Sequence, residues 1–136
     1  YRRSFSDYII DNNKKNKTTY LYSNIYFNPV FINNLIEIIL KLIEKDKRGI
    51  YNIASKQKLS KYQFGLILTK KFNMNQNLIK EKIYKKNYQI KRPHDMSLST
   101  KKIQKNLNIK LKTIEQEIND LYKFKTKQYF REISSL

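Results

Sequence analysis

The sequence predicts a mixed α/β fold of short strands and amphipathic helices. Apolar residues recur at helical spacing in several segments, short β-branched runs lie between these segments, and turn residues such as Gly49 and Asn73 separate them. A length of 136 residues fits one domain and is enough to bury a core. We therefore expect a single region over residues 1–136, without repeats or flexible linkers.

Two elements are predicted near the N-terminus. A short helix carrying Phe5, Tyr8 and Ile9 follows Ser4 or Ser6, either of which can cap it. The β-rich run 18–22 then predicts a strand.

The longest amphipathic helix is predicted to begin at Pro29 and to end near Asp46. Proline suits the first helical position, and Asn28 before it is a candidate cap. The predicted core stripe comprises Phe31, Leu35, Ile38, Ile39 and Leu42.

A glycine break separates this helix from the next two predicted elements. Gly49 supplies the break, and residues 50–54 are predicted to form a short buried strand. Ser60 and Gln63 then have the spacing of a capping box at the start of a further helix. Its predicted core face comprises Phe64, Ile67, Leu68 and Phe72.

The last third of the chain predicts a strand, two short capped helices and a tail. After a polar turn at residues 73–77, residues 78–84 predict a strand with Ile79 and Ile83 on one side. The helices carry Ile103 and Leu107 behind Ser99 or Thr100, and Ile114, Ile118, Leu121 and Tyr122 behind the pair Thr113 and Gln116. Residues 125–136 are predicted to form a loose tail.

A cation beside a rigid turn is the most specific feature of the chain. Pro93 fixes its own φ and pushes Arg92 toward an extended conformation, so the guanidinium projects from stiff backbone. A planar guanidinium can bind two oxygens of a diphosphate at once. The alternative is a structural role, in which Arg92 pairs with the nearby Asp95 or caps a helix end.

The block 90–103, IKRPHDMSLSTKKI, resembles the RP-x-(D/N)-x-x-L-(S/D)-x-x-K pattern of the dTDP-4-dehydrorhamnose reductase family, within the extended short-chain dehydrogenases/reductases. NPVFINNL at 28–35, GIYNIA at 49–54 and LSKYQF at 59–64 are similar to further family landmarks in the family's order. Asn33 and Asn34 stand where the family usually has an acidic residue, and His94 stands where related epimerases often have glycine.

This resemblance implies the C-terminal, substrate-binding portion of an extended, NAD(P)-binding Rossmann-type reductase, with residues 1–24 ending the Rossmann-side segment. The implied reaction is the reduction of a 4-keto nucleotide sugar for the synthesis of surface polysaccharide. A homodimer is the expected assembly of the full-length protein. We expect the cofactor and the catalytic residues in an upstream half, because two glycines cannot build a dinucleotide turn and none of the eleven tyrosines has a lysine four residues later. A chain that starts at Tyr1 fits such a fragment.

The formal charge of +18 raises the alternative of a basic module for nucleic acid or an acidic polymer. Lysine greatly outnumbers arginine and the basic clusters are spread along the chain, so a solvated coat and a biased, AT-rich genome explain the charge better. A regulatory subunit of the same fold is a further alternative.

The remaining site predictions are few. Asn28 and Tyr51 are candidate substrate contacts beside Arg92, although a tyrosine in a short strand is more often core. His94 has no second ligand at metal spacing, so no metal is expected. The absence of cysteine fits a reducing cytoplasm, and the apolar run 35–43 is interrupted by charges and too short to span a membrane.

Overall fold

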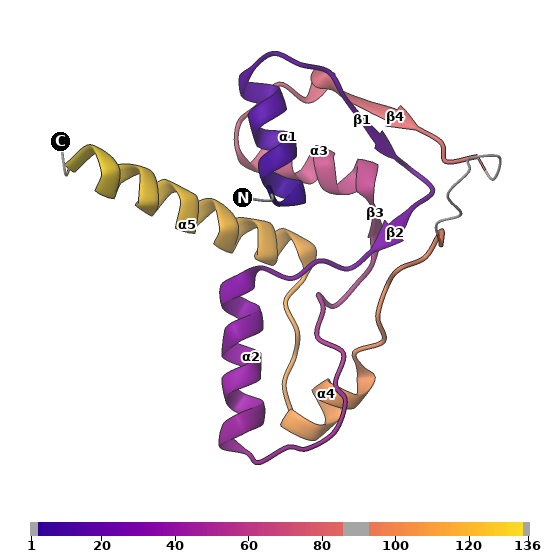
Figure 1. Ribbon diagram of the computed structural model, residues 1–136, viewed down its shortest axis with the longest axis vertical. Helices are drawn as coiled ribbons and strands as arrows, with labels where there is room; N and C mark the ends of the chain where they lie inside the picture. The colour runs from indigo at the N-terminus through magenta and orange to yellow at the C-terminus, as the bar shows by residue number, and fades with distance from the viewer. Residues whose placement is uncertain (1–2, 86–92, 135–136) are drawn as a thin grey trace. The chain divides into compact units, whose positions relative to one another are not determined.

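The structure is a computed structural model that describes residues 3–85 and 93–134 (Figure 1). The chain divides into two compact units. Unit 1 comprises residues 1–27 and 59–96, and unit 2 comprises residues 28–58 and 97–136. Each unit contains segments from both halves of the sequence, so each depends on long-range contacts.

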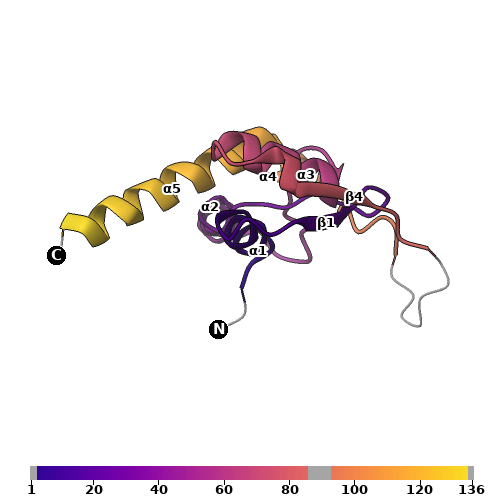
Figure 2. The same ribbon diagram turned by 90° about the horizontal axis from the view of Figure 1, so that it is seen from above.

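Unit 1 is built on a pair of parallel strands, β1 (Thr19–Tyr22) and β4 (Ile79–Lys82). Thr19 lies opposite Ile79 in this register. Parallel neighbours need a long crossover, and helix α3 (Lys61–Lys71) lies on that connection and packs on both strands. Figure 2 looks along the second helix of the unit, α1 (Phe5–Lys14), which packs against α3.

Both helices of unit 1 begin where the sequence predicts. The Ser4 hydroxyl accepts a hydrogen bond from the Asp7 N–H at the start of α1, at 3.1 Å. Ser60 and Gln63 form the capping box of α3, with each side chain accepting the other residue's backbone N–H. The buried apolar side chains of the unit are Ile9, Ile10, Leu21, Ile25, Leu59, Phe64, Leu68, Ile79 and Tyr84.

A two-residue antiparallel pair completes the described strands of unit 1: β2 (Tyr26–Phe27) and β3 (Leu59–Ser60). Beside it, the rings of Phe5, Phe27 and Phe64 contact one another with centroids 5.5 to 5.8 Å apart. This aromatic group connects α1, β2 and α3, so it anchors a strand too short to be stable alone.

The predicted strand 78–84 is shorter in the structure. Leu78 ends a 3-10 turn, η1 (Gln76–Leu78), and β4 stops at Lys82. Ile79 is buried as expected, but Ile83 lies beyond the strand and is 58% exposed. The prediction of a strand that reaches Tyr84, with Ile79 and Ile83 on one side, is therefore wrong, because the ladder with β1 ends at Lys82.

The described residues of unit 2 form three helices, α2 (Ile32–Glu44), α4 (Lys101–Leu107) and α5 (Ile114–Ser134). Its core includes Ile103 and Leu107, predicted on α4, together with Leu111. Partly buried side chains from α2, from the segment after it and from the residues after α4 pack against this cluster: Ile38, Leu42, Tyr51, Ile53 and Ile109.

Helix α2 begins three residues later than predicted. Phe31 occupies the cap position, and Asn28 does not cap the helix because its side chain is hydrogen-bonded to Leu98 and Ser55. The Phe31 N–H instead donates to the Glu117 carboxylate from α5, at 2.8 Å. A distant carboxylate therefore takes the role that the sequence assigned to a neighbouring asparagine.

The prediction of a strand at residues 50–54 is wrong. Gly49 has a φ of 102°, which supports the break, but no ladder partner for the next five residues exists among the described residues. Burial still alternates, because Tyr51 and Ile53 are partly buried whereas Asn52 is exposed and Ile50 is 86% exposed. The segment is extended without a neighbouring strand.

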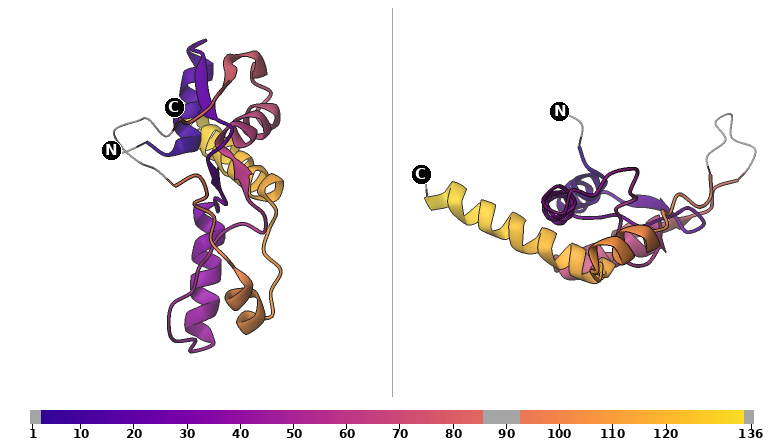
Figure 3. Two further views of the ribbon diagram at one scale, coloured as in Figure 1. Left: turned by 90° about the vertical axis from the view of Figure 1, so that its right-hand side faces the viewer. Right: turned by 90° about the horizontal axis from the view of Figure 1, so that it is seen from below.

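Helix α5 starts with the predicted box of Thr113 and Gln116, whose side chains accept each other's backbone N–H at 3.4 and 2.9 Å. Figure 3 shows α5 as one continuous helix. It continues to Ser134, so most of the predicted tail 125–136 is helical backbone.

Candidate functional site

Arg92, the principal predicted contact, lies outside the described residues, but both flanks of its segment are described. The Asn24 side chain donates to the Tyr84 carbonyl at 2.9 Å and accepts the Tyr84 N–H at 2.8 Å. His94 Nδ1 lies 3.1 Å from the Asn24 carbonyl, and its ring meets that of Tyr84 edge-on at 5.7 Å. Asn24 therefore brings residues 84 and 94 to one point of unit 1.

The backbone after Arg92 is fixed by a short pairing with β2. The Tyr26 N–H donates to the His94 carbonyl at 2.7 Å, and the Met96 N–H donates to the Tyr26 carbonyl at 2.9 Å. Tyr26 and Asp95 form a parallel bridge between them. Two backbone hydrogen bonds thus hold residues 94–96 in a defined position.

Asn28, a predicted contact, is a bridge within unit 2. Its side-chain amide donates to the Leu98 carbonyl at 2.9 Å and its oxygen accepts the Leu98 N–H at 2.9 Å. A longer bond of 3.4 Å reaches the Ser55 carbonyl. Asn52 repeats the pattern by donating to the Ser99 carbonyl at 3.2 Å. These asparagines hold residues 98–99 beside the segment 52–55, and a ligand contact by Asn28 stays a prediction.

Tyr51 lies against α4. Its ring packs on the core cluster, its hydroxyl accepts a hydrogen bond from Asn106 at 3.0 Å, and Lys102 Nζ stands 4.5 Å from the ring centroid. Lys102 also donates to the Ile50 carbonyl at 2.8 Å. The structural interpretation of Tyr51 as a core residue fits these contacts, and its substrate contact stays a prediction.

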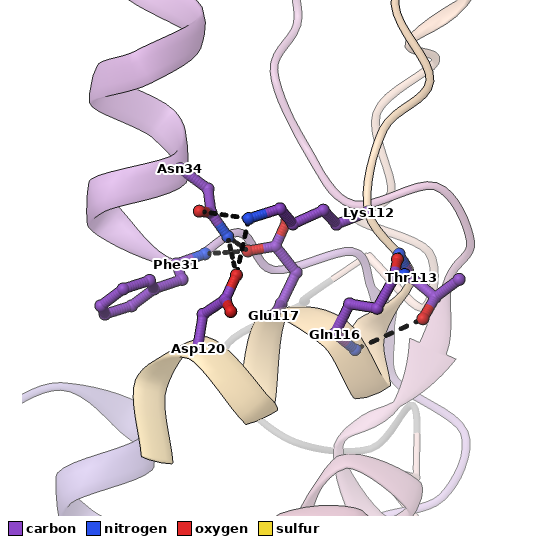
Figure 4. Close-up of polar contacts among 7 residues, drawn as sticks. All are labelled: Phe31, Asn34, Lys112, Thr113, Gln116, Glu117 and Asp120. Carbon is purple, nitrogen blue, oxygen red and sulfur yellow. Dashed lines mark hydrogen bonds and ion pairs between the residues drawn. The ribbon is translucent and has the colours of Figure 1, made fainter. Parts of the chain in front are cut away.

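A polar network connects the first turn of α2 to α5 (Figure 4). One Glu117 oxygen accepts the Phe31 N–H at 2.8 Å and the Asn34 side-chain N–H at 2.7 Å. Lys112 Nζ donates to Asp120 at 2.7 Å and to the Asn34 oxygen at 2.9 Å. The Asn34 side-chain amide also donates to Asp120 at 3.1 Å, so Asn34 bridges two carboxylates and one ammonium group.

The pKa values of the two acids in this network are shifted in opposite directions. Burial raises the pKa of Glu117, and the hydrogen bonds from Phe31 and Asn34 oppose the rise only in part. Burial acts on Asp120 in the same direction, but hydrogen bonds from Lys112 and Asn34 outweigh it and lower the pKa of Asp120. The hydrogen bond to Asp120 in turn raises the pKa of Lys112.

Sequence reasoning missed both Asn24 and Glu117. A signal for Glu117 existed, because it is a charged residue directly beside Ile118 on the apolar side of α5, where burial requires a partner. Asn24 carries no such signal, since its partners are backbone groups 60 residues away.

Neither glycine fits a dinucleotide pyrophosphate. Gly65 lies inside α3, and Gly49 follows the C-terminal end of α2, so neither stands at a strand-to-helix turn. Within residues 3–85 and 93–134, no group of three or more metal-ligating side chains occurs. None of the helices that these residues form has the length and apolar character needed to cross a membrane.

Replacing Asn24 by alanine is expected to lower the free energy of unfolding by about 1 to 3 kcal/mol, because backbone groups of the buried Tyr84 lose their partner. Urea unfolding followed by circular dichroism measures this loss. The control is Asn77→Ala at an exposed turn, expected to change stability by less than about 0.5 kcal/mol. Equal effects of the two substitutions would contradict the anchoring role of Asn24.

The sequence of the chain matches a known protein family. The model of the RmlD substrate binding domain matches residues 1–126. The chain belongs to the RmlD substrate-binding domain family. Its mixed α/β fold is that of the C-terminal portion of an extended, Rossmann-type reductase, as the sequence predicts. No curated protein matched the chain.

Solved structures resemble this RmlD-type chain over most of its length. The dTDP-4-dehydrorhamnose reductase of Bacillus anthracis, solved in complex with NADP, matches 90% of the chain with a TM-score of 0.81 and 17% identity. That of Clostridium acetobutylicum matches 92% with a TM-score of 0.80 and 13% identity. A hypothetical dTDP-4-dehydrorhamnose reductase from Sulfolobus tokodaii matches 82% with a TM-score of 0.68 and 28% identity.

The RmlD-type chain spans less than half of these proteins. It covers 43% of the Bacillus anthracis reductase, 45% of the Clostridium acetobutylicum protein and 40% of the Sulfolobus tokodaii protein. The Bacillus anthracis and Clostridium acetobutylicum reductases are only 17% and 13% identical to the chain, so their similarity shows the fold alone.

Proposed function

We propose that this chain provides the nucleotide-sugar contacts of an NAD(P)-dependent reductase similar to dTDP-4-dehydrorhamnose reductase. The family match over residues 1–126 carries this proposal. The proposed product serves surface polysaccharide synthesis, the cytoplasm is the proposed compartment, and a homodimer is the proposed assembly of the full-length protein.

The proposed contacts begin with Arg92, which would bind the diphosphate. Support comes from the residues on either side of its segment, because Asn24 joins Tyr84 to His94 and β2 pairs with residues 94–96. A guanidinium on backbone with fixed ends loses less entropy when it binds two phosphate oxygens.

Asn28 and Tyr51 are the proposed further contacts in unit 2. Their present hydrogen bonds go to Leu98 and Asn106, so a ligand would have to share or replace these partners. The dinucleotide belongs in a separate cofactor-binding half, because neither glycine of this chain fits its pyrophosphate. Hydride chemistry would therefore take place only when that half is present.

The test is a calorimetric titration of the chain with dTDP-glucose. Arg92→Lys is expected to weaken binding by about 1.5 to 3 kcal/mol, because the charge remains but the bidentate geometry is lost. The melting temperature should stay unchanged, since the lysine keeps the charge on the same backbone.

Lys91→Ala is the control, because a general loss of positive potential would weaken binding by both variants alike. Affinity that is unchanged in Arg92→Lys, with a lowered melting temperature, would assign Arg92 to a structural role. Binding of generic duplex DNA that resists added salt would favour a nucleic-acid module instead.

A further inference from the structure

The two ring nitrogens of His94 have different surroundings. Nδ1 lies 3.1 Å from the Asn24 carbonyl oxygen. A carbonyl oxygen can only accept, so Nδ1 carries a hydrogen whether the ring is neutral or charged. Among residues 3–85 and 93–134, none forms a hydrogen bond with Nε2. The neutral ring therefore presents an acceptor at Nε2, and the protonated ring presents a charged donor there.

The imidazole ring is held in place within unit 1. Tyr84 meets it edge-on with centroids 5.7 Å apart, and the Asn24 side chain hydrogen-bonds both backbone groups of Tyr84. The His94 carbonyl accepts the Tyr26 N–H at 2.7 Å, which fixes the backbone below the ring. His94 is only half-buried, so part of the held side chain remains open to a ligand.

The surroundings of His94 carry an excess of positive charge. Lys82 ends β4, where its Nζ stands 5.5 Å from the centroid of the Tyr22 ring, and that ring meets Tyr84 edge-on. Lys85 follows Tyr84 directly in the sequence. Asp95 supplies the opposing charge beside His94. A further positive charge at His94 thus adds to a local field that already favours an anion.

We propose that Nε2 of protonated His94 donates a hydrogen bond to a phosphate oxygen of the nucleotide sugar, so that mild acid strengthens binding. This inference rests on the proposed function, because it adds one contact to the nucleotide-sugar site. The contact is particular to this chain, since His94 stands where related epimerases often have glycine. A ring whose orientation is already held loses little entropy when it binds a ligand.

A pH dependence of binding can be assigned to His94 because the chain has no other histidine and no cysteine. Tyrosine, lysine and aspartate ordinarily keep one charge state between about pH 5.5 and about pH 8, whereas histidine changes its charge in this range. The diphosphate of a nucleotide sugar is esterified at both ends, so it has no terminal phosphate group to titrate. The ionisable neighbours of His94 in segments 23–26, 82–85 and 93–95 are Tyr26, Lys82, Tyr84, Lys85 and Asp95.

The first experiment titrates the chain with dTDP-glucose in a calorimeter at about pH 5.5 and about pH 8. We expect the original chain to bind at least about fivefold more tightly at the lower pH, because a charge-assisted hydrogen bond forms only there. His94→Gln should lose most of this difference, since glutamine retains a donor for the Asn24 carbonyl but carries no charge at either pH.

Two variants serve as controls for this titration. Lys85→Gln removes a neighbouring charge that is present at both pH values, so it should weaken binding by a similar factor at each. Glu117 is the acid of unit 2 whose pKa is raised, and Glu117→Gln removes its titration. Glu117→Gln should therefore keep the pH dependence of the original chain.

The second experiment follows the imidazole C–H signal of the original chain by nuclear magnetic resonance as the pH is changed. A single histidine gives a single imidazole to follow, so the measurement needs no variant that must fold. Saturating dTDP-glucose should move the titration midpoint of this signal to higher pH, because a nearby anion stabilises the charged ring. A histidine that only anchors residues 94–96 would titrate alike with and without the ligand.

Two results would overturn the inference while leaving the proposed function intact. One is an equal ratio of affinities at the two pH values in the original chain and in His94→Gln. The other is a titration midpoint that bound dTDP-glucose does not move. An absence of dTDP-glucose binding at both pH values would instead overturn the proposed function, and the inference with it.

Discussion

Replacing Gly65 by alanine should destabilise the protein, although alanine is the better helix former by about 1 kcal/mol. An added methyl group would overlap Leu21 Cδ1 and stand 3.3 Å from Ile79 Cγ2. Both neighbours are buried, on the paired strands β1 and β4, so neither can move into solvent. Overpacking of this kind costs about 1 to 3 kcal/mol, and we expect valine at position 65 to exceed that range.

Urea unfolding of Gly65→Ala, Leu21→Ala and the double variant separates this clash from other effects. Leu21→Ala alone is expected to cost about 2 to 5 kcal/mol. In that background, Gly65→Ala should cost nothing or stabilise the helix, because the overlapping atom is gone. Strictly additive losses would show that the Leu21 contact is not the cause.

The second large effect is expected at Glu117. Glu117→Ala should lower the free energy of unfolding by about 1 to 3 kcal/mol, because the part-buried Phe31 N–H loses its acceptor and the buried Asn34 amide loses one of its two acceptors. Glu117→Gln keeps an acceptor oxygen in the same place and avoids the burial of a charge. It should be at least as stable as the original protein at neutral pH.

The contributions of Glu117 and Asp120 to the stability of the fold are expected to change with pH in opposite directions. Glu117 has a raised pKa, so its stabilising contribution is complete below the ordinary value of 4.5 and is lost as the pH rises through the folded-state value. The advantage of Glu117→Gln should therefore shrink as the medium becomes more acidic. An advantage that grows on acidification would contradict burial as the dominant cause.

Asp120 has the opposite dependence. Its pKa is lowered, so its contribution is present above the ordinary value of 3.8 and is lost as the pH falls through the folded-state value. Asp120→Asn should destabilise at neutral pH and match the original protein in strong acid. Melting curves of the three proteins across this range measure both trends.

Local signals in the sequence predicted the helices better than the strands. Ser4, Ser60 and Thr113 each make the capping bond that their spacing predicts, because all partners lie within three residues. The start of α2 and the strand at 50–54 were predicted wrongly, because their outcome depends on Glu117 and on a neighbouring strand. Neither influence is visible in a local pattern.

The candidate site shows the same limit. Arg92 was identified by its proline and by the resemblance, whereas Asn24 was not, although it holds both flanks of that segment. A hydrogen bond between residues 60 positions apart leaves no periodic trace in a single sequence. The prediction of Asn28 as a helix cap is wrong, because its side chain holds Leu98 beside Ser55 within unit 2, and its substrate contact stays a prediction.

This chain contains only two glycines, and asparagine or aspartate occupies the left-handed positions after its helices. Helices α1 to α4 are each followed by a left-handed residue with φ between 42 and 53°, and these residues are Asn16, Asp46, Asn73 and Asn108. Asparagine and aspartate tolerate this conformation, so a chain can replace glycine at helix ends. Gly49, with its φ of 102°, and Gly65, with no space for a methyl group, are the two glycines that remain. The two glycines of this chain therefore lie where backbone geometry at Gly49 and steric contact at Gly65 disfavour any larger residue.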